Sequence, residues 1–332
     1  DVYKRQYQTQ DKGPLLPLFA YTAVGWHDGK FWAAGFRSDA DCRQDFTQFD
    51  QQRIDQRTAR KLKQYRHNRL IQHLGTCCLT YRCPAARNYF LGRWEAPLPT
   101  SPGCNARCLG CISLQPSECC PSTQERLQFT PSVKEVAEVG VAHLDSAARP
   151  VVSFGQGCEG EPLLQVDLLE SSIKEMRRLT DRGTINCNTN ASRPNTIARL
   201  REAGLDSIRV SLNSARETFY HNYYRPRNYE FSDVRDSIMA MKQGGGFVSL
   251  NYFILPGFTD SEQETEAFLK LIAETGPDFI QLRNLNIDPE WYLAEIGSTA
   301  TSAACGIREW LARIKAAFPS LRFGYYNPCL NP

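Results

Sequence analysis

Three cysteines, Cys104, Cys108 and Cys111, lie within the short segment SPGCNARCLGC. The segment is polar and contains a proline, which predicts a loop. Thiolates bind both zinc and iron–sulfur clusters, and the number of protein ligands separates the two kinds of site. A structural zinc ion takes four protein ligands, whereas three cysteines on a [4Fe–4S] cluster leave one iron open to a ligand that is not protein.

The zinc interpretation needs a fourth thiolate, which Cys119 or Cys120 would supply. The chain would then be a non-catalytic zinc-binding module with four cysteine ligands that binds a protein or a nucleic acid. Structural zinc sites usually draw their ligands from two short pairs, however, and such a module does not need a large α/β body. An electron-transfer cluster protein is a third interpretation, but it leaves the segment EGEP (159–162) without a role.

The elements that must position these cysteines follow a regular pattern. Amphipathic helical stretches separate short β-rich runs at 88–94, 150–154, 184–188, 207–212, 247–255 and 278–285. Strands that alternate with helices predict βα units and a parallel sheet. About six units predict an α/β fold, a partial (β/α)6-type parallel barrel, with function at the carboxyl ends of its strands.

Local signals predict the boundaries of several elements. Asp28-Gly29 between aromatic flanks predicts a hairpin turn within a β-rich lead-in, and residues 50–74 predict one charged helix. Thr130 is predicted to cap a helix that starts at Pro131. Ser261 and Glu264 match a capping box, and Gly276-Pro277 is predicted to end the same helix.

Three segments follow from these elements: a small N-terminal β/α extension over 1–87, with a β-hairpin, a charged helix and a loop that contains Cys77, Cys78 and Cys83; a core over 88–290; and a C-terminal helix and tail over 291–332. The net charge of +3 gives no argument for nucleic acid or an anionic membrane. No apolar run has the length of a membrane span, and thirteen cysteines without a signal peptide predict a reducing, cytoplasmic environment. The opening DVYKRQ lacks a methionine, so we leave open whether residues 1–6 are native.

The pattern C-x3-C-x2-C resembles the cluster loop of the radical S-adenosylmethionine (SAM) superfamily. In that family three cysteines hold a [4Fe–4S] cluster, and the amino and carboxylate groups of SAM fill the open iron. The resemblance implies that the three cysteines of the opening segment are cluster ligands. Gly110 stands where the family usually has an aromatic residue, and Leu109 or Ile112 is expected to supply the apolar cover instead.

The segment SFGQGCEGEPLL resembles the Gly-Gly-Glu turn of the same family, where backbone carbonyls and the glutamate accept hydrogen bonds from the SAM ammonium. Glycine lets backbone approach a ligand closely, and a carboxylate suits a cation. The resemblance implies that Glu159, Gly160, Glu161 and Pro162 contact SAM, with Glu161 as the ammonium acceptor.

Later strand ends extend the resemblance, which covers residues 88–285. The expected contacts with the ribose and carboxylate of SAM are Asn188, Asn190, Ser211 and Asn213, although polar residues at strand ends are also ordinary turn formers. The segment 253–261 resembles the turn that packs near the adenine. The aromatic and basic segment 220–231 is expected either to wall the substrate pocket or to pack as a lid.

The resemblance implies a reaction and its partners. A flavodoxin- or ferredoxin-like donor would reduce the cluster, SAM would be cleaved to a 5′-deoxyadenosyl radical, and the radical would take hydrogen from an unidentified substrate. A peptide or protein, an RNA and a small molecule all remain open as substrates. The N-terminal hundred residues are the expected place for substrate specificity.

The remaining cysteines allow two interpretations. They are either buried thiols or ligands of a second metal site that draws on some of Cys77, Cys78, Cys83, Cys119 and Cys120. Cys158 lies inside the predicted SAM turn, whereas Cys187, Cys305 and Cys329 are taken as structural. The histidines do not cluster in the sequence, and His67 and His73 are expected on the protein surface.

Overall fold

Parallel strands form one curved sheet in this protein, as a computed structural model shows for residues 15–22, 24–33, 35, 37–42, 46–115, 121–298 and 304–331. In these residues the sheet has seven strands, and their spatial order follows the chain. The strands are β3 (Glu95–Pro97), β4 (Val151–Phe154), β5 (Thr184–Thr189), β6 (Ser207–Leu212), β7 (Phe247–Ile254), β8 (Phe279–Asn284) and β9 (Arg322–Gly324). The predicted α/β fold with a partial parallel barrel is confirmed.

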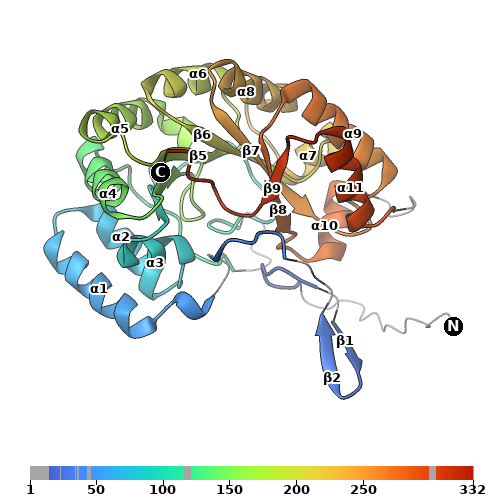
Figure 1. Cartoon of the computed structure of the whole chain (residues 1–332), viewed down its shortest axis with the longest axis horizontal. Coiled ribbons are helices and arrows are strands. Elements are labelled where there is room, and N and C mark those ends of the chain that lie inside the picture. Colours follow the sequence, from blue (N-terminus) through green and yellow to red (C-terminus); the bar gives the residue numbers. More distant parts are fainter. Residues whose placement is uncertain are drawn as a thin grey trace.

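Helices follow each strand from β3 to β8, and most of them surround the outer face of the sheet (Figure 1). They are α4 (Val133–Ser146), α5 (Val166–Leu179), α6 (Pro194–Ala203), α7 (Glu217–Tyr224), α8 (Phe231–Gln243), α9 (Glu262–Thr275), α10 (Pro289–Ile296) and α11 (Ile307–Ala317). Their apolar stripes pack on strands that are themselves buried, as parallel sheets require. On α5, for example, the buried side chains include Leu169, Ile173 and Met176.

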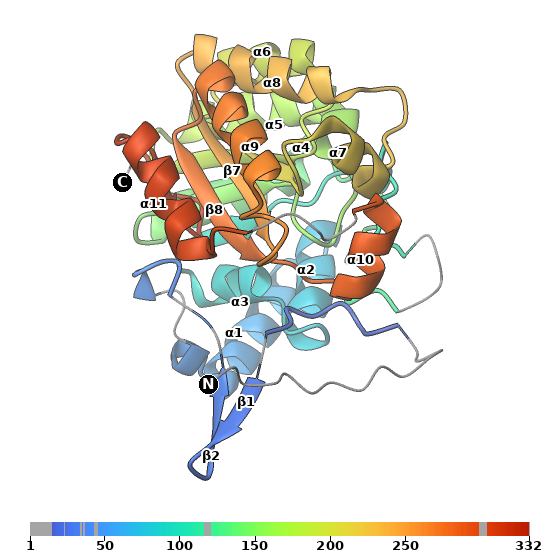
Figure 2. The ribbon, with the colours of Figure 1, turned by 90° about the vertical axis from the view of Figure 1, so that its right-hand side faces the viewer.

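Residues 24–33 form the predicted hairpin. Strands β1 (Val24–His27) and β2 (Lys30–Ala33) pair antiparallel, and Asp28 and Gly29 both have positive φ, 51° and 71°, as a tight hairpin turn demands. The hairpin projects from the body of the molecule (Figure 2), and all eight strand residues are exposed.

The helical part of the N-terminal extension differs from the prediction. Instead of one helix over 50–74 there are two, α1 (Gln51–Gln64) and α2 (Arg69–Leu79), because Asn68 starts a new helix by accepting a hydrogen bond from the backbone of Ile71. The prediction of a loop around Cys77 and Cys78 is therefore wrong. Both cysteines lie in α2 and are completely buried.

The first predicted strand, 88–94, is also wrong. These residues end helix α3 (Pro84–Leu91), which has proline in its first turn and is closed by Gly92 with a φ of 68°. The apolar run therefore packs with helical rather than strand periodicity, and the first strand starts later, at Glu95. Residues 291–332 contribute more than a helix and tail, since they include β9.

Two cap predictions need correction. The N-cap of α4 is Ser132 rather than Thr130, because Glu135 completes a capping box with Ser132. Ser261 does precede α9, but the side chain of Glu264 turns away from it and accepts hydrogen bonds from Ser214, Ala215 and Tyr252. Gly276 ends α9 as predicted, with a φ of 59°. None of the helices in the described parts of the chain is long and apolar enough to span a membrane.

Candidate functional site

A cavity of about 530 Å³ opens at the carboxyl ends of the strands. Its lining comes from the loop after β3, the turn after β4, and the last residues of β5, β6, β7 and β8. This volume is in the ordinary range for a small-molecule site. The cavity lies where parallel barrels place their ligands.

Cys104, Cys108 and Cys111 all line this cavity. Their loop is held by the carboxyl end of α7. The N–H groups of Arg107 and Leu109 donate to the carbonyl oxygens of Tyr224 and Tyr223, at 2.8 and 3.1 Å. The last carbonyls of a helix have no partner within that helix, so α7 fixes the cysteine loop through them.

The spacing of the three thiols distinguishes between the two metal interpretations. Ligands of one zinc ion, each at ~2.3 Å from the metal, lie about 3.8 Å apart. The three Sγ atoms are not all within 4.8 Å of one another. This wider spacing suits cysteines that each bind a different iron of a cluster. The fourth zinc ligands suggested by the sequence, Cys119 and Cys120, lie outside the described residues.

Burial keeps two cysteines of this loop protonated in the absence of a metal. Burial raises the pKa of the Cys104 thiol to about 11 and that of Cys108 well above its usual range. Both are thus neutral thiols without a metal, and metal binding releases their protons. Nη2 of Arg126 lies 3.4 Å from Sγ of Cys111 and places a positive charge next to the thiolates that a metal would create.

The turn after β4 lies directly against the cysteine loop. The N–H groups of Gly160 and Glu161 donate to the carbonyl oxygens of Ser101 and Gly103, at 2.7 and 2.8 Å. A Cβ atom on Gly160 would lie 1.8 Å from the Gly103 oxygen, so a side chain does not fit there. The glycine thus allows the two backbone segments to form one wall of the cavity.

Glu161 lines the cavity but is already engaged by the protein. Its carboxylate accepts hydrogen bonds from the Thr189 hydroxyl and from the N–H groups of Leu163 and Asn190, at 2.5, 3.0 and 2.8 Å. A carboxylate has about four acceptor positions, so one is left for a ligand. Burial raises the pKa of Glu161 to about 7.

Glu159 lines the cavity, and the protein engages its carboxylate fully. Five groups donate to its carboxylate: two N–H groups and a hydroxyl from residues 100 and 101, and the N–H groups of Gly155 and Gln156. These donors fill its acceptor positions, so its carboxylate holds the two loops together. Pro162 starts a short 3-10 helix and is buried outside the cavity lining.

The polar residues at strand ends divide into two groups. Asn188, Asn190 and Ser211 line the cavity, whereas Asn213 does not. Asn213 is completely buried, and its amide donates to the Phe219 carbonyl and the Tyr292 hydroxyl, at 3.0 and 3.1 Å. Strand β6 ends at Leu212, and Asn213 then connects α7 to α10 rather than contacting a ligand.

The apolar cover next to Gly110 comes from an unexpected element. A Cβ atom on Gly110 would lie 2.9 Å from the Tyr223 hydroxyl and 3.7 Å from Ile287. These two side chains occupy the space that an aromatic residue at position 110 would take. Leu109 is buried outside the cavity lining, while Ile112 does line the cavity. The segment 220–231 was expected either to wall a pocket or to pack as a lid. Two of its residues, Tyr223 and Tyr224, line the cavity.

Sequence reasoning missed the basic side chains inside the barrel. Arg209 and Arg283 line the cavity together with Asn251. Nη1 of Arg209 lies 3.3 Å from Oε1 of Gln281, whereas its Nε has no hydrogen-bond partner among the described residues. Burial lowers the pKa of Arg209. A sequence signal for Arg209 was present. The strand SIRVSL (207–212) has a polar residue at every second position and is otherwise apolar, which predicts one polar face.

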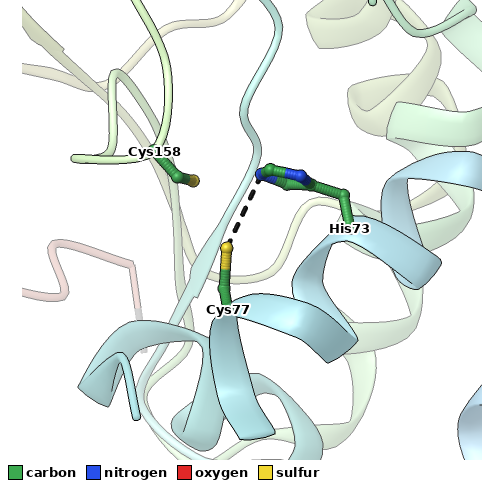
Figure 3. A group of neighbouring side chains, drawn as sticks. All are labelled: His73, Cys77 and Cys158. Carbon is green, nitrogen blue, oxygen red and sulfur yellow. Dashed lines mark hydrogen bonds between the residues drawn. The ribbon is translucent and has the colours of Figure 1, made fainter. Parts of the chain in front are cut away.

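Cys77, Cys78 and Cys83, which were considered for a second metal site, have different neighbours, and Cys119 and Cys120 lie outside the described residues. Cys77 lies with His73 and Cys158 (Figure 3), while Sγ of Cys78 lies 3.5 Å from the Thr58 hydroxyl. Cys83 precedes α3 and lines the cavity. His73 is half-buried rather than on the surface.

The chain is similar to known proteins. The family model of the radical SAM superfamily matches residues 98–272. Two proteins named GTP 3',8-cyclase are similar: one from Lactiplantibacillus plantarum, 27% identical over 48% of this chain and 45% of that protein, and one from Paenarthrobacter nicotinovorans, 28% identical over 57% and 50%. The chain thus spans about half the length of these curated relatives. Among solved structures, Streptococcus suis SuiB bound to S-adenosylmethionine is 13% identical, with a TM-score of 0.49 over 73% of this chain and 54% of that one.

Proposed function

Because the chain belongs to the radical SAM superfamily, we propose that Cys104, Cys108 and Cys111 hold a [4Fe–4S] cluster and that the adjoining cavity binds SAM. When bound, the cluster supplies one electron that splits SAM into methionine and a 5′-deoxyadenosyl radical, which removes hydrogen from the substrate. A flavodoxin- or ferredoxin-like protein is the proposed electron donor. The observation that carries the proposal is the contact of the cysteine loop with the Gly160 turn, both on one wall of the cavity.

The residues of the chain have separate roles in this proposal. Gly160 brings the backbone of its turn against the cysteine loop, and the remaining acceptor position of Glu161 receives the SAM ammonium. Asn190 and Ser211 bind polar groups of SAM. Tyr223 covers the apolar face beside Gly110, where it keeps water from the reacting centre.

Replacing a cluster ligand tests the proposal. In Cys108→Ala we expect anaerobically reconstituted protein to lose formation of 5′-deoxyadenosine from SAM with dithionite, because the cluster lacks one of its three thiolates. Cys305→Ala is the control, since Cys305 is an exposed thiol away from the cavity lining. Wild-type SAM cleavage by the Cys108→Ala protein would contradict the ligand assignment.

We further propose that the substrate is a small molecule with a phosphate group. Arg209 on β6 and Arg283 on β8 both line the cavity, and Arg209 keeps one unpartnered donor among the described residues. Arginine binds phosphate oxygens through paired donors. The names of the curated relatives make GTP the first compound to test.

Binding of GTP and guanosine to the SAM-loaded protein separates phosphate recognition from base recognition. We expect GTP to bind about tenfold or more tightly than guanosine, since a hydrogen bond to a charged group is worth ~1.5–3 kcal/mol. Arg283→Met should remove most of this difference and leave SAM cleavage in place. Equal affinities for the two compounds would contradict the phosphate proposal.

A further inference from the structure

A histidine and two cysteines from distant parts of the chain meet next to the cavity wall. His73 and Cys77 lie four residues apart on α2, and Cys158 lies in the loop after β4 (Figure 3). One ligand atom from each lies within 4.8 Å of the other two. Nε2 of His73 is 3.6 Å from Sγ of Cys77.

Burial makes this cluster different from ordinary free thiols. Cys77 is 0% exposed and Cys158 is 3% exposed, and His73 is half-buried above them. Residues four apart on a helix face the same side, so His73 and Cys77 present their donor atoms together to Cys158. Three donor atoms that converge in a buried site form a preorganised binding place for one cation.

The electrostatics of the two thiols agree with this geometry. The hydrogen bond from Cys158 and the adjacent His73 lower the pKa of Cys77 to about 5, against the opposing effect of burial. The pKa of Cys158 is raised, because it shares its proton with Cys77 and is buried. Both shifts follow from the close approach of the two sulfur atoms.

We propose that His73, Cys77 and Cys158 bind one Zn²⁺ ion. Zinc takes nitrogen and sulfur ligands at ~2.0–2.3 Å in a tetrahedron, and the close spacing suits a single ion rather than a cluster. The fourth position is filled by water or by Cys83, whose N–H donates to the Cys77 carbonyl at 2.9 Å. This site shares no residue with the three cysteines of the loop at 101–111.

The ion would join the N-terminal helices to the core. Cys158 directly precedes the residues Glu159 to Glu161 of the Gly160 turn, and its carbonyl accepts a hydrogen bond from Leu127 at 2.8 Å. Zinc at Cys158 would thus fix this turn to α2. An effect of this contact on SAM binding would rest on the proposed function, whereas the metal site itself does not.

Metal analysis of a chain without cluster ligands tests the site directly. In the variant with Cys104, Cys108 and Cys111 all changed to alanine, expressed with zinc, we expect one zinc per chain after dialysis. Further replacement Cys77→Ala or Cys158→Ala should remove it. Cys78→Ala is the matched control, since Cys78 is the adjacent, equally buried cysteine of α2 and should leave zinc content unchanged.

Two further measurements leave His73, Cys77 and Cys158 in place, so they do not require that variants at these positions fold. Cobalt added to the metal-free variant that lacks Cys104, Cys108 and Cys111 should give a thiolate charge-transfer band, which zinc abolishes. Zinc in the chain purified without reconstitution should be present independently of its iron content. The proposal is overturned by chains that bind neither zinc nor cobalt, by zinc content that survives loss of Cys77 and Cys158, or by a Cys77–Cys158 disulfide in place of metal. None of these results depends on SAM cleavage, so the proposed function is judged separately.

Discussion

Gly160 shows how one residue can determine the cofactor site. Its missing side chain allows the turn after β4 to lie on the cysteine loop, because an added Cβ would lie 1.8 Å from the Gly103 oxygen. That obstacle is backbone, which cannot move aside as a flexible side chain does. The residue thus couples the two segments that are proposed to hold the cluster and SAM.

Gly160→Ala should therefore destabilise the protein by about 3 kcal/mol and strongly reduce SAM cleavage, because the turn must move off the loop. Thermal unfolding and 5′-deoxyadenosine formation measure the two effects. Gly103→Ala is the control from the other side of the same contact, since its added Cβ would lie 3.7 Å from Leu164, an ordinary separation. Equal behaviour of the two variants would show that the contact is not needed.

The sequence predicted some residues of the site better than others. Cysteine spacing and the EGEP turn are local patterns, and both segments reached the cavity wall. The roles of Glu159 and Asn213 could not be read from sequence, because both depend on donors and acceptors brought by distant segments. Tyr223 was equally hidden, since it reaches Gly110 from a helix more than a hundred residues away.

The Glu135 carboxylate is one of the contacts that connect α2 to the core. Glu135, in the first turn of α4, accepts hydrogen bonds from the guanidinium and N–H of Arg69 and from Ser132. It therefore caps its own helix and holds the first residue of α2. Helix α2 also carries His73 and Cys77, further along its length.

This carboxylate predicts acid sensitivity. The hydrogen bond from Arg69 lowers the pKa of Glu135 from its ordinary 4.5 to about 2, so the ionised form stabilises the fold above pH 4.5. That stabilisation is lost as the pH falls from 4.5 towards 2. We expect the difference in thermal midpoint between the unsubstituted chain and Glu135→Gln to be full at pH 6 and to shrink below pH 4.5.

Glu202→Gln, which changes an exposed carboxylate of α6, is the control. A Glu135→Gln deficit that stays constant down to pH 2 would mean that packing, rather than ionisation, accounts for the effect.

Elements were predicted best where periodicity was long. The strands from β4 to β8 appeared at the expected places because each is a buried run between helices with clear boundaries. The run 88–94 failed because a short apolar segment fits both a helix and a strand. Strand β9 has three residues, which is too short for any periodic signal.

At the scale of the whole molecule, the open sheet leaves a polar interior at its carboxyl end. Glu95, Asn188, Arg209, Asn251 and Arg283 line the same cavity as the three cysteines. Polar and charged side chains are costly inside a barrel unless a ligand, water or another polar group binds them. The cavity thus combines a wall of three cysteines with polar and charged side chains, which suits the proposed cofactor and a polar substrate.

The central claim is that the three loop cysteines hold a cluster with an iron open to SAM. Electron paramagnetic resonance of the anaerobically reconstituted, dithionite-reduced protein, with and without SAM, tests it most directly. We predict a [4Fe–4S]⁺ signal that changes shape when SAM is added and that is absent from Cys108→Ala. A protein with no cluster signal that instead holds zinc, lost when Cys104, Cys108 and Cys111 are replaced, would contradict the claim.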